Sequence, residues 1–417
     1  MPVIEKLTAL EILDSRGRPT VGATCVLASG ATAWASVPSG ASTGKAEAVE
    51  LRDGDPKRYG GLGCRTAVGH VNRELNDVLA RRSFPDQSQL DKAMLELDGT
   101  PNKSRIGANA ILAVSVAFAR ASARERGVPL YSHFAEIIKS SRTRLPRLTV
   151  NLFSGGKHAG GQVPIQDVLL VPVSAQSIDE SLADVYAVYQ AAAGLTARKY
   201  AARALVADEG GLAPPFESAE AMLRDAVEAI ELAGFSPGTD VALAVDVAAS
   251  HFYLNGTYHL GASALRSRQM IEQVERWVGE YPIVSVEDGL AEDDWENWPA
   301  LRNALGTKAI VMGDDLLCTN SHRIKRAIES KSANALLLKV NQIGTLTEAA
   351  EANAIARSAG WAVTVSARSG ETEDDWLADL AIGWAGDYIK IGSITRSERL
   401  AKYNRLLAIE NETKGTP

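Results

Sequence analysis

Charged residues end a series of short apolar runs in the second half of the chain. The runs are ALVADE ending on Glu209, VALAVD on Asp246, PIVSVE on Glu287, AIVMGD on Asp314, ALLLK on Lys339, AVTVSARS on Arg368 and Ser369, and DYIK on Lys390. Apolar, β-branched runs separated by helical stretches are typical of buried parallel strands. When such strands close into a barrel, their carboxyl ends meet at one mouth, where barrel enzymes carry their catalytic groups. We therefore predict one pocket that contains these side chains.

Three of these residues are carboxylates that directly follow strand-like runs. Asp246, Glu287 and Asp314 would repel one another at a barrel mouth unless a cation lay between them. Hard oxygen ligands in this number suit Mg²⁺, which usually retains some waters and takes further ligands from its substrate. The alternative is that each acid caps the helix that follows it. Capping is a weaker explanation when three acids end strand-like runs of one series and Lys339 ends the next run.

Lys339 and Glu209 are candidates for proton transfer. Near a metal site, neighbouring cations and burial both push the pKa of a lysine down, toward a neutral amine that can accept a proton. The alternative for Lys339 is a lysine that extends its ammonium group to solvent at the rim. Glu209 lies in the sequence DEGG, where a glycine turn could carry a general acid or could be an ordinary turn.

Two segments rich in glycine and serine could bind phosphate. They are PSGASTG at residues 38–44 and SGGKHAGG at residues 154–161. Backbone N–H groups in such loops can cradle phosphates, and such loops can also act as lids or be plain turns. His158 is the histidine that lies within a glycine loop, and we interpret the other five histidines as structural.

The order of the expected elements divides the chain in two. Residues 1–138 show strands followed by helices, which is typical of an α+β domain. Residues 139–147 are short, polar and basic, and form the predicted linker. Residues 148–417 alternate strand and helix over roughly the length of a (β/α)8 barrel. The expected strands are 5–12, 20–27 and 32–37, and the expected helices are 66–81, 107–126, 262–278, 321–330, 345–359 and 374–385. The predicted fold class is therefore α/β, with a C-terminal TIM-like barrel and an N-terminal α+β capping domain.

Composition excludes several classes of protein. The 417 residues carry a formal net charge of -7 and show no basic stripe with interleaved aromatics, so nucleic acid is not an expected partner. No apolar run approaches the roughly 18 residues of a membrane span, and the first residues lack the pattern of a targeting signal. Cys25, Cys64 and Cys318 are too far apart to suggest a zinc or disulfide framework. We expect a cytoplasmic protein without membrane partners.

Several stretches of the chain resemble the signature stretches of the enolase family. In order, they are ILDSRGRPTV, VPSGASTG, EAVELRDGD, SVEDGLAEDDWENW, LLLKVNQIGTLTEA, RSGETEDDW and RSERLAKYN. The enolase superfamily is known to combine a Lys or His base with Mg²⁺ ions that stabilise an enediolate. The resemblance implies a lyase that removes water from a phosphorylated glycerate, with two Mg²⁺ ions per active site. It also implies a barrel whose first units depart from strict β/α order.

The resemblance implies a role for each matching position. Asp246, Glu287 and Asp314 match the ligands of the first Mg²⁺, Ser42 matches a ligand of the second, Lys339 matches the base at C2, and Glu209 matches the acid at the C3 hydroxyl. Arg368 and Ser369 match the phosphate-binding pair, Lys390 matches a group that contacts the substrate carboxylate, and His158 and Gln166 match pocket residues. The base and the acid are expected on opposite sides of the substrate.

Three pocket positions depart from the family pattern. Asp167 stands where the family has a glutamate, and Ala367 stands where it has a histidine. Both changes are expected to enlarge the pocket near the leaving hydroxyl. Lys157 adds a cation where the family commonly has a small polar residue.

These departures leave three hypotheses for the function. The one we favour on sequence is a specialised paralogue that dehydrates a bulkier phosphonate analogue, such as a carboxyphosphonoenolpyruvate synthase. The alternative is an ordinary glycolytic enolase that converts 2-phosphoglycerate to phosphoenolpyruvate. A third, of another class, is an inactive enolase kept as a binding or structural protein. The expected partner is a phosphorylated or phosphonylated glycerate.

The oligomeric state is also open. The charged pair that joins the two subunits of family dimers corresponds here to Gly22 and Ala408, so both partners are absent together. No charge is therefore left unpaired. A homo-oligomer would need apolar contacts instead.

Overall fold

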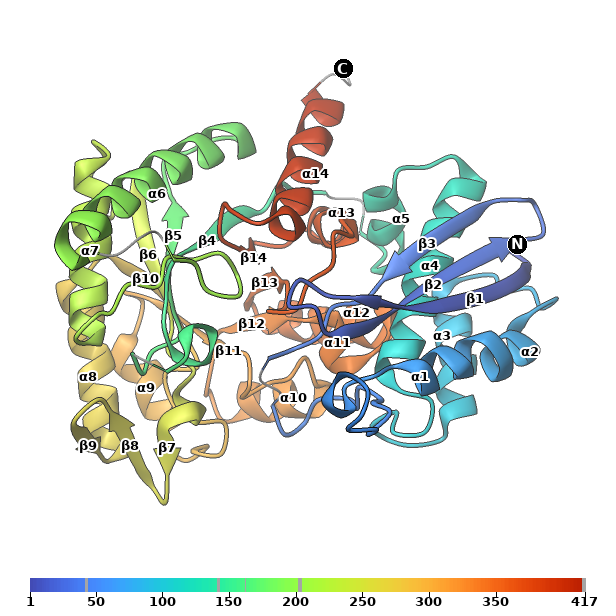
Figure 1. Ribbon diagram of the computed structural model, residues 1–417, viewed down its shortest axis with the longest axis horizontal. Coiled ribbons are helices and arrows are strands. Elements are labelled where there is room, and N and C mark those ends of the chain that lie inside the picture. The colour runs from blue at the N-terminus through green and yellow to red at the C-terminus, as the bar shows by residue number, and fades with distance from the viewer. Residues whose placement is uncertain (42–43, 141–142, 162, 202–204, 415–417) are drawn as a thin grey trace.

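The computed structural model describes residues 1–41, 44–140, 143–161, 163–201 and 205–414. An N-terminal sheet with its helices lies beside a closed barrel (Figure 1). The predicted α/β fold class, with a barrel and an N-terminal α+β domain, is confirmed. Each helix in the described parts of the chain is too short or too polar to cross a membrane.

The N-terminal part is a three-stranded antiparallel sheet packed on a buried helix. Its strands are β1 (Ile4–Leu13), β2 (Pro19–Leu27) and β3 (Thr32–Ser36), and its helices are α1 (Arg65–His70), α2 (Asn76–Leu79), α3 (Gln87–Asp98), α4 (Ala108–Arg126) and α5 (Leu130–Ile137). Helix α4 packs against β2 and β3 and is buried on nearly all sides, because its sequence is apolar or small almost throughout. It ends where Gly127 adopts a left-handed conformation. The helix expected over 66–81 is interrupted by a π-helical turn between α1 and α2.

Eight strands close the barrel in the order β10-β11-β12-β13-β14-β4-β5-β6. They are β4 (Arg147–Ser154), β5 (Asp167–Pro172), β6 (Val241–Asp246), β10 (Ile283–Glu287), β11 (Ile310–Gly313), β12 (Ala335–Leu338), β13 (Ala362–Ser366) and β14 (Tyr388–Gly392). Strand β5 is antiparallel to both of its neighbours, and the other adjacent pairs are parallel. The amino end of β5 therefore lies at the same mouth as the carboxyl ends of the other strands.

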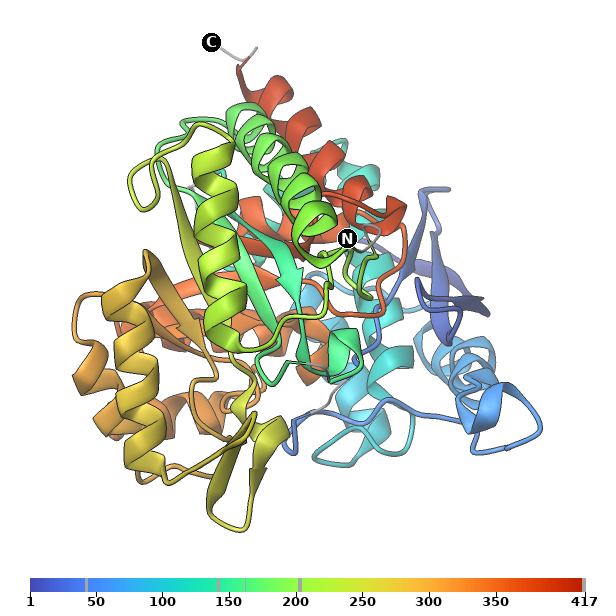
Figure 2. The same cartoon turned by 60° about the vertical axis from the view of Figure 1, so that its left-hand side comes forward.

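Helices surround the barrel. They are α6 (Ile178–Tyr200), α7 (Ala219–Leu232), α8 (Ser267–Glu280), α9 (Trp298–Leu305), α10 (Ser321–Glu329), α11 (Val340–Ile343), α12 (Leu346–Ser358), α13 (Trp376–Gly383) and α14 (Ser397–Lys414). A small sheet, formed by β7 (Tyr253–Leu254), β8 (Thr257–Leu260) and β9 (Ser263–Leu265), projects from the barrel (Figure 2). The helix expected over 262–278 was wrong at its start, because those first residues form β9.

The run ALVADE was also wrongly predicted to be a barrel strand. Its described residues form no regular strand, and Val206 makes only an isolated bridge with Leu212. The two glycines that follow Glu209 explain the turn, since Gly210 has a φ of 88°. The barrel closes through β4 and β5, without this run.

The N-terminal helices pack against the later barrel helices. Helices α3 and α4 contact α12, α4 contacts α11, and α5 contacts α13. Asp91 on α3 is fully buried and accepts hydrogen bonds from the backbone N–H and the hydroxyl of Thr347 on α12, at 2.9 and 2.6 Å. These contacts fix the N-terminal segments relative to the mouth of the barrel.

Candidate active site

Three carboxylates meet at the mouth of the barrel. Asp246 ends β6, Glu287 ends the neighbouring β10 and Asp314 directly follows β11. The register pairs Glu287 with Asp246 across the two strands, and all three side chains are buried. Burial, and then the charge of Asp246, raise the pKa of Glu287 well above its ordinary range. The structure therefore brings together the three acids that the sequence singled out.

Two lysines lie among these acids. Lys390 Nζ donates to Asp246 Oδ2 and to Glu287 Oε2, each at 2.8 Å. Burial alone would lower the pKa of Lys390, but the charges of Asp246 and Glu287 hold it well above its usual value. Lys390 is buried within β14, which continues to Gly392. The predicted strand DYIK, which ended on Lys390, was therefore too short.

Lys339 follows β12 and its ammonium group pairs with Asp314. Burial lowers the pKa of Lys339, but the neighbouring carboxylates, Asp314 first and then Glu287, together raise it above the ordinary value. The lowered pKa that we expect for Lys339 applies to a site that holds a metal ion, and it stays a prediction. The raised pKa follows from the charges of these nearby carboxylates, of which Asp314 is in direct contact.

The donor set fits a hard divalent cation. Glu287 Oε1 is buried and has no hydrogen-bond partner among the described residues, and the same is true of Gln166 Oε1. Single oxygens of Asp288, Asp314 and Asp315 also lie within 4.8 Å of one another, close enough to share a metal ion. Clustered, buried and partly unpaired oxygens of this kind are the ligands that Mg²⁺ takes.

A second group of polar residues lies where β4, β5 and the turn at Glu209 meet. Asp167 is fully buried at the start of β5, with Ser154 Oγ donating to its Oδ1 at 2.6 Å and His158 Nδ1 at 3.0 Å from its Oδ2. His158 Nε2 lies 3.8 Å from Glu209 Oε1, and Asn151 Nδ2 donates to Glu209 Oε2 at 3.0 Å. The imidazole of His158 is thus held between two carboxylates.

The protonation of this second group follows from its charges. Burial alone would lower the pKa of His158, but Asp167 and then Glu209 raise it to about 9. Burial raises the pKa of Glu209, but the charges of His158, Arg399 and the two lysines together outweigh burial and lower it. At neutral pH the group therefore contains an imidazolium beside an ionised Glu209.

Gln166 connects the second group to the carboxylates. Its Nε2 donates to Asp246 Oδ2 at 3.1 Å and its backbone N–H donates to the Asp246 carbonyl at 3.0 Å. Glu209, Asp167 and His158 could also share a metal ion by their spacing.

The expected phosphate-binding pair lies against the N-terminal part of the chain. Arg368 NH1 and NH2 donate to the two carboxylate oxygens of Glu47, at 3.0 and 3.2 Å. Ser369 Oγ accepts a hydrogen bond from the backbone N–H of Ala41 at 2.7 Å. Ser42, the expected ligand of a second Mg²⁺, lies outside the described residues.

The positions that depart from the family pattern lie in different surroundings. Ala367 is buried after β13, and its backbone N–H donates to the Lys390 carbonyl at 2.8 Å. Lys157 is exposed in the 3₁₀ turn that carries His158. Burial, and then the charge of Lys157, lower the pKa of His251 to about 4.

Sequence reasoning missed four polar residues of the site. Glu47 and Asn341 contact Arg368. Asn151 contacts Glu209, and Gln342 contacts Asp314. The sequence offered a signal for each of them. Glu47 lies in the motif EAVELRDGD, Asn341 and Gln342 lie in LLLKVNQIGTLTEA, and Asn151 lies in the strand before SGGKHAGG.

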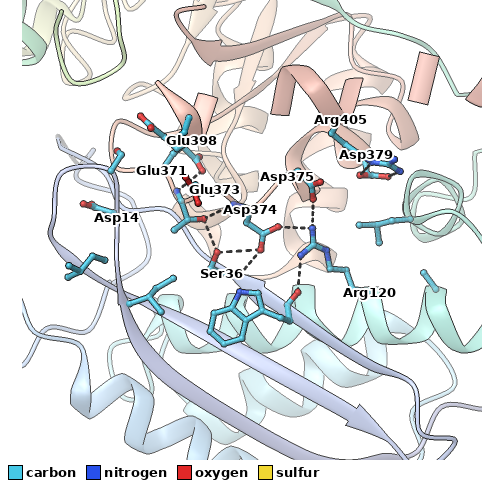
Figure 3. A pocket seen from close by; sticks show the side chains of 18 of the residues that line it. Asp14, Ser36, Arg120, Glu371, Glu373, Asp374, Asp375, Asp379, Glu398 and Arg405 are labelled. Atoms are coloured by element: carbon cyan, nitrogen blue, oxygen red, sulfur yellow. Dashed lines mark hydrogen bonds and ion pairs between the residues drawn. The ribbon is translucent and has the colours of Figure 1, made fainter. Parts of the chain in front are cut away.

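A separate hollow lies between the N-terminal sheet and helices α13 and α14 (Figure 3). It is rich in acids, and several of them pair with arginines. Arg120 NH2 lies 2.6 Å from Asp374 Oδ1 and 2.7 Å from Asp375 Oδ1, and Arg405 binds Asp379 through two nitrogens. The residues expected to carry catalysis, Lys339 and Glu209, do not line this hollow.

The barrel mouth and its residues define the class of protein. A buried cluster of carboxylates, lysines and an arginine at the mouth of a barrel, with an N-terminal domain packed against it, is typical of a metal-dependent barrel enzyme. Residues 4–134 match the family model of the enolase N-terminal domain, and residues 142–416 match that of the enolase C-terminal TIM barrel domain. The chain is also 48% identical over 412 residues to Enolase 1 of Methylococcus capsulatus, which covers 98% of this chain and 97% of that protein. The chain belongs to the enolase family and is a hydro-lyase.

Proposed function

We propose that the protein converts 2-phosphoglycerate to phosphoenolpyruvate with Mg²⁺ bound at the barrel mouth. The observation that carries the proposal is the placement of two proton-transfer groups on opposite sides of the barrel. Lys339 follows β12, whereas His158 and Glu209 lie beside Asp167 at the start of β5. Strand β5 is the fourth strand from β12 around the eight-stranded ring. A substrate between them would have a base on one side and an acid on the other. The near-complete match to an enolase supports the same reaction.

In the proposed reaction, Lys339 accepts the proton from C2 of the substrate as a neutral amine. Mg²⁺ bound by Asp314 would favour this form, because it would offset the carboxylate charge that raises the pKa of Lys339. Glu209 and His158 assist departure of the C3 hydroxyl as water, and the imidazolium of His158 supplies the proton that ionised Glu209 lacks. Asp246, Glu287 and Asp314 would bind Mg²⁺, with Ser42 as a ligand of a second ion. Ions held by these residues would supply electrostatic stabilisation for the second negative charge that develops on the substrate carboxylate.

The remaining groups bind and orient the substrate. Arg368 and Ser369 bind its phosphate, and Lys390 contacts its carboxylate. Gln166 and Asp167 fix their neighbours Asp246 and His158 by the hydrogen bonds described above. Positioning of this kind lowers the entropy cost of reaching the reactive geometry.

The bulkier phosphonate substrate remains the second candidate. It is favoured by Ala367, which has no side chain beyond Cβ beside the phosphate-binding Arg368, and by the short side chain of Asp167. An inactive protein is disfavoured on physical grounds. Burying several charged carboxylates and lysines is costly, and a protein without catalysis gains nothing from that cost.

A comparison of substrates tests the proposal. With Mg²⁺, the ultraviolet absorbance of the enolpyruvate product should show turnover of 2-phosphoglycerate in preference to a phosphonate analogue. The paired change Asp167→Glu with Ala367→His should raise activity on 2-phosphoglycerate if the two departures weaken the acid side of the pocket. Turnover of the phosphonate alone would overturn the proposal in favour of the specialised paralogue.

We also propose the domain limits 1–138 and 148–417 with a linker at 139–147, and activity in the cytoplasm. A homo-oligomer, if formed, would use apolar contacts. Position 22 has no room for the charged side chain of the family pair, because a ring atom of Trp34 lies 2.0 Å from the site of a Cβ there.

A further inference from the structure

Glu47 makes a contact with Arg368 that spans the two parts of the chain. Arg368 NH1 and NH2 donate to separate oxygens of the Glu47 carboxylate, at 3.0 and 3.2 Å. The two side chains are only 4% and 8% exposed. A bidentate pair of this kind fixes the plane and the position of a guanidinium group.

Further donors hold the Glu47 carboxylate itself. The backbone N–H of Gly44 donates to Oε1 at 2.9 Å, and Gln342 Nε2 lies 3.4 Å from the same oxygen. The backbone N–H of Ala48 donates to the carbonyl of Gln342 at 2.8 Å. The segment around Glu47 is therefore attached to α11, and the carboxylate has little freedom to move.

Gln342 extends this network to the carboxylate cluster. Its Nε2 donates to Asp314 Oδ1 at 2.8 Å, and its Oε1 accepts a hydrogen bond from Thr319 Oγ1 at 2.8 Å. Asn341, its neighbour, accepts from Arg368 NH1 at 3.1 Å. Glu47 is thus the central acceptor of a buried chain of contacts from Arg368 to Asp314.

We propose that Glu47 is a positioning residue that holds Arg368 in the orientation needed to bind the phosphate of the substrate. This inference rests on the proposed function, in which Arg368 binds phosphate. Loss of the Glu47 charge would free the guanidinium group to rotate and would expose it to competing acceptors. The predicted consequence is weaker phosphate binding rather than a slower chemical step.

The test uses Glu47→Gln, which keeps the shape of the side chain and removes its charge. The matched control is Glu50→Gln, three residues along the same segment, where the carboxylate binds Arg52 NH2 and Ser39 Oγ. We measure KM and kcat for 2-phosphoglycerate, and the competitive inhibition constant of inorganic phosphate. Glu47→Gln should raise KM and the inhibition constant together, by about tenfold or more, as for loss of a charged hydrogen bond. Its kcat should stay within about threefold of wild type, because the interaction acts on binding, and Glu50→Gln should resemble wild type.

The variant Arg368→Gln separates this inference from the proposed function. If Arg368→Gln weakens phosphate inhibition and Glu47→Gln does not, the role of Glu47 is refuted while the phosphate site stands. If Arg368→Gln leaves KM and phosphate inhibition unchanged, the phosphate site itself is wrong, and the role of Glu47 falls with it. Tighter phosphate binding in Glu47→Gln would show that Glu47 competes with the substrate, and would also refute the proposal. In the double variant, Glu47→Gln should add no further loss to Arg368→Gln.

Discussion

Removal of the charge of Asp167 should shift the pH dependence of catalysis. Asp167 faces His158 Nδ1 at 3.0 Å, and the charges of Asp167 and Glu209 overcome burial to raise the pKa of His158 to about 9. The imidazolium is therefore the resting form at neutral pH, and deprotonation limits activity only on the alkaline side. Asp167→Asn keeps the size of the side chain but removes the charge that favours the imidazolium.

The structure gives the size of this effect. A hydrogen bond to a charged group contributes about 1.5–3 kcal/mol, and about 1.4 kcal/mol changes an acid equilibrium tenfold. Deprotonation of His158 should therefore become roughly tenfold to a hundredfold easier, and the alkaline limb of the kcat profile should move to lower pH. The assay follows product absorbance against pH at saturating Mg²⁺ and substrate.

A matched control separates this effect from general damage to the fold. Asp225 on α7 is also a fully buried carboxylate, but its partners are Lys199 and Tyr200 on α6. Asp225→Asn should leave the shape of the pH profile unchanged. An alkaline limb of Asp167→Asn that coincides with that of wild type would refute the reasoning.

Three further predictions concern the metal, the acid stability and the N-terminal sheet. Glu287→Gln should weaken Mg²⁺ binding by more than about tenfold. About tenfold is the smallest loss expected when a residue that only supports a metal ligand is changed, and Glu287 is proposed as a ligand itself. An affinity equal to that of wild type, measured by calorimetry, would contradict the assignment. Burial, and then the charge of Arg126, lower the pKa of His133 to about 4. As the pH falls from about 6.5 toward 4, His133 binds a proton in the unfolded chain but stays neutral in the folded chain. The free energy of unfolding therefore decreases over this pH range. Urea unfolding of wild type should show about 2 kcal/mol of this loss between pH 7 and pH 5; an equal pH dependence in His133→Gln would rule out this source. Gly22→Ala should lower the free energy of unfolding by about 1–3 kcal/mol, because the added methyl group overpacks against Trp34. Trp34→Ala combined with Gly22→Ala should remove this loss. If Gly22→Ala is as stable as wild type, the ring moves aside freely and the prediction is wrong.

Much of the site was predictable because local patterns encode it. The strands β6, β10, β11 and β12 are apolar runs that end directly before or on a charged residue. A parallel arrangement sends such ends to one mouth, so Asp246, Glu287, Asp314 and Lys339 could be grouped without knowing any contact.

The residues that were misplaced or missed depend on topology or on distant contacts. Asp167 begins a strand, and only the antiparallel direction of β5 brings it to the mouth. The run before Glu209 is as apolar as a strand, but Gly210 and Gly211 turn the chain there. Glu47 and Arg368 are 321 positions apart, and no local pattern links them.

The pKa of Lys339 illustrates a different limit. Its burial and its cationic neighbours were predictable from sequence and both lower the pKa. The charge of Asp314 acts in the opposite direction, and the sequence does not specify the geometry of its contact with Lys339. Electrostatic shifts depend on the distances between specific atoms, so their sign cannot be read from residue types alone.

Exchange of the C2 hydrogen tests the central claim, that Lys339 and the Glu209 side of the pocket act separately on opposite faces of the substrate. In heavy water with Mg²⁺, the wild-type protein and Glu209→Gln should both exchange the C2 hydrogen of 2-phosphoglycerate with solvent. Lys339→Ala should lose this exchange by roughly a hundredfold or more. Exchange by Lys339→Ala at the wild-type rate, or its loss in Glu209→Gln alone, would contradict the account.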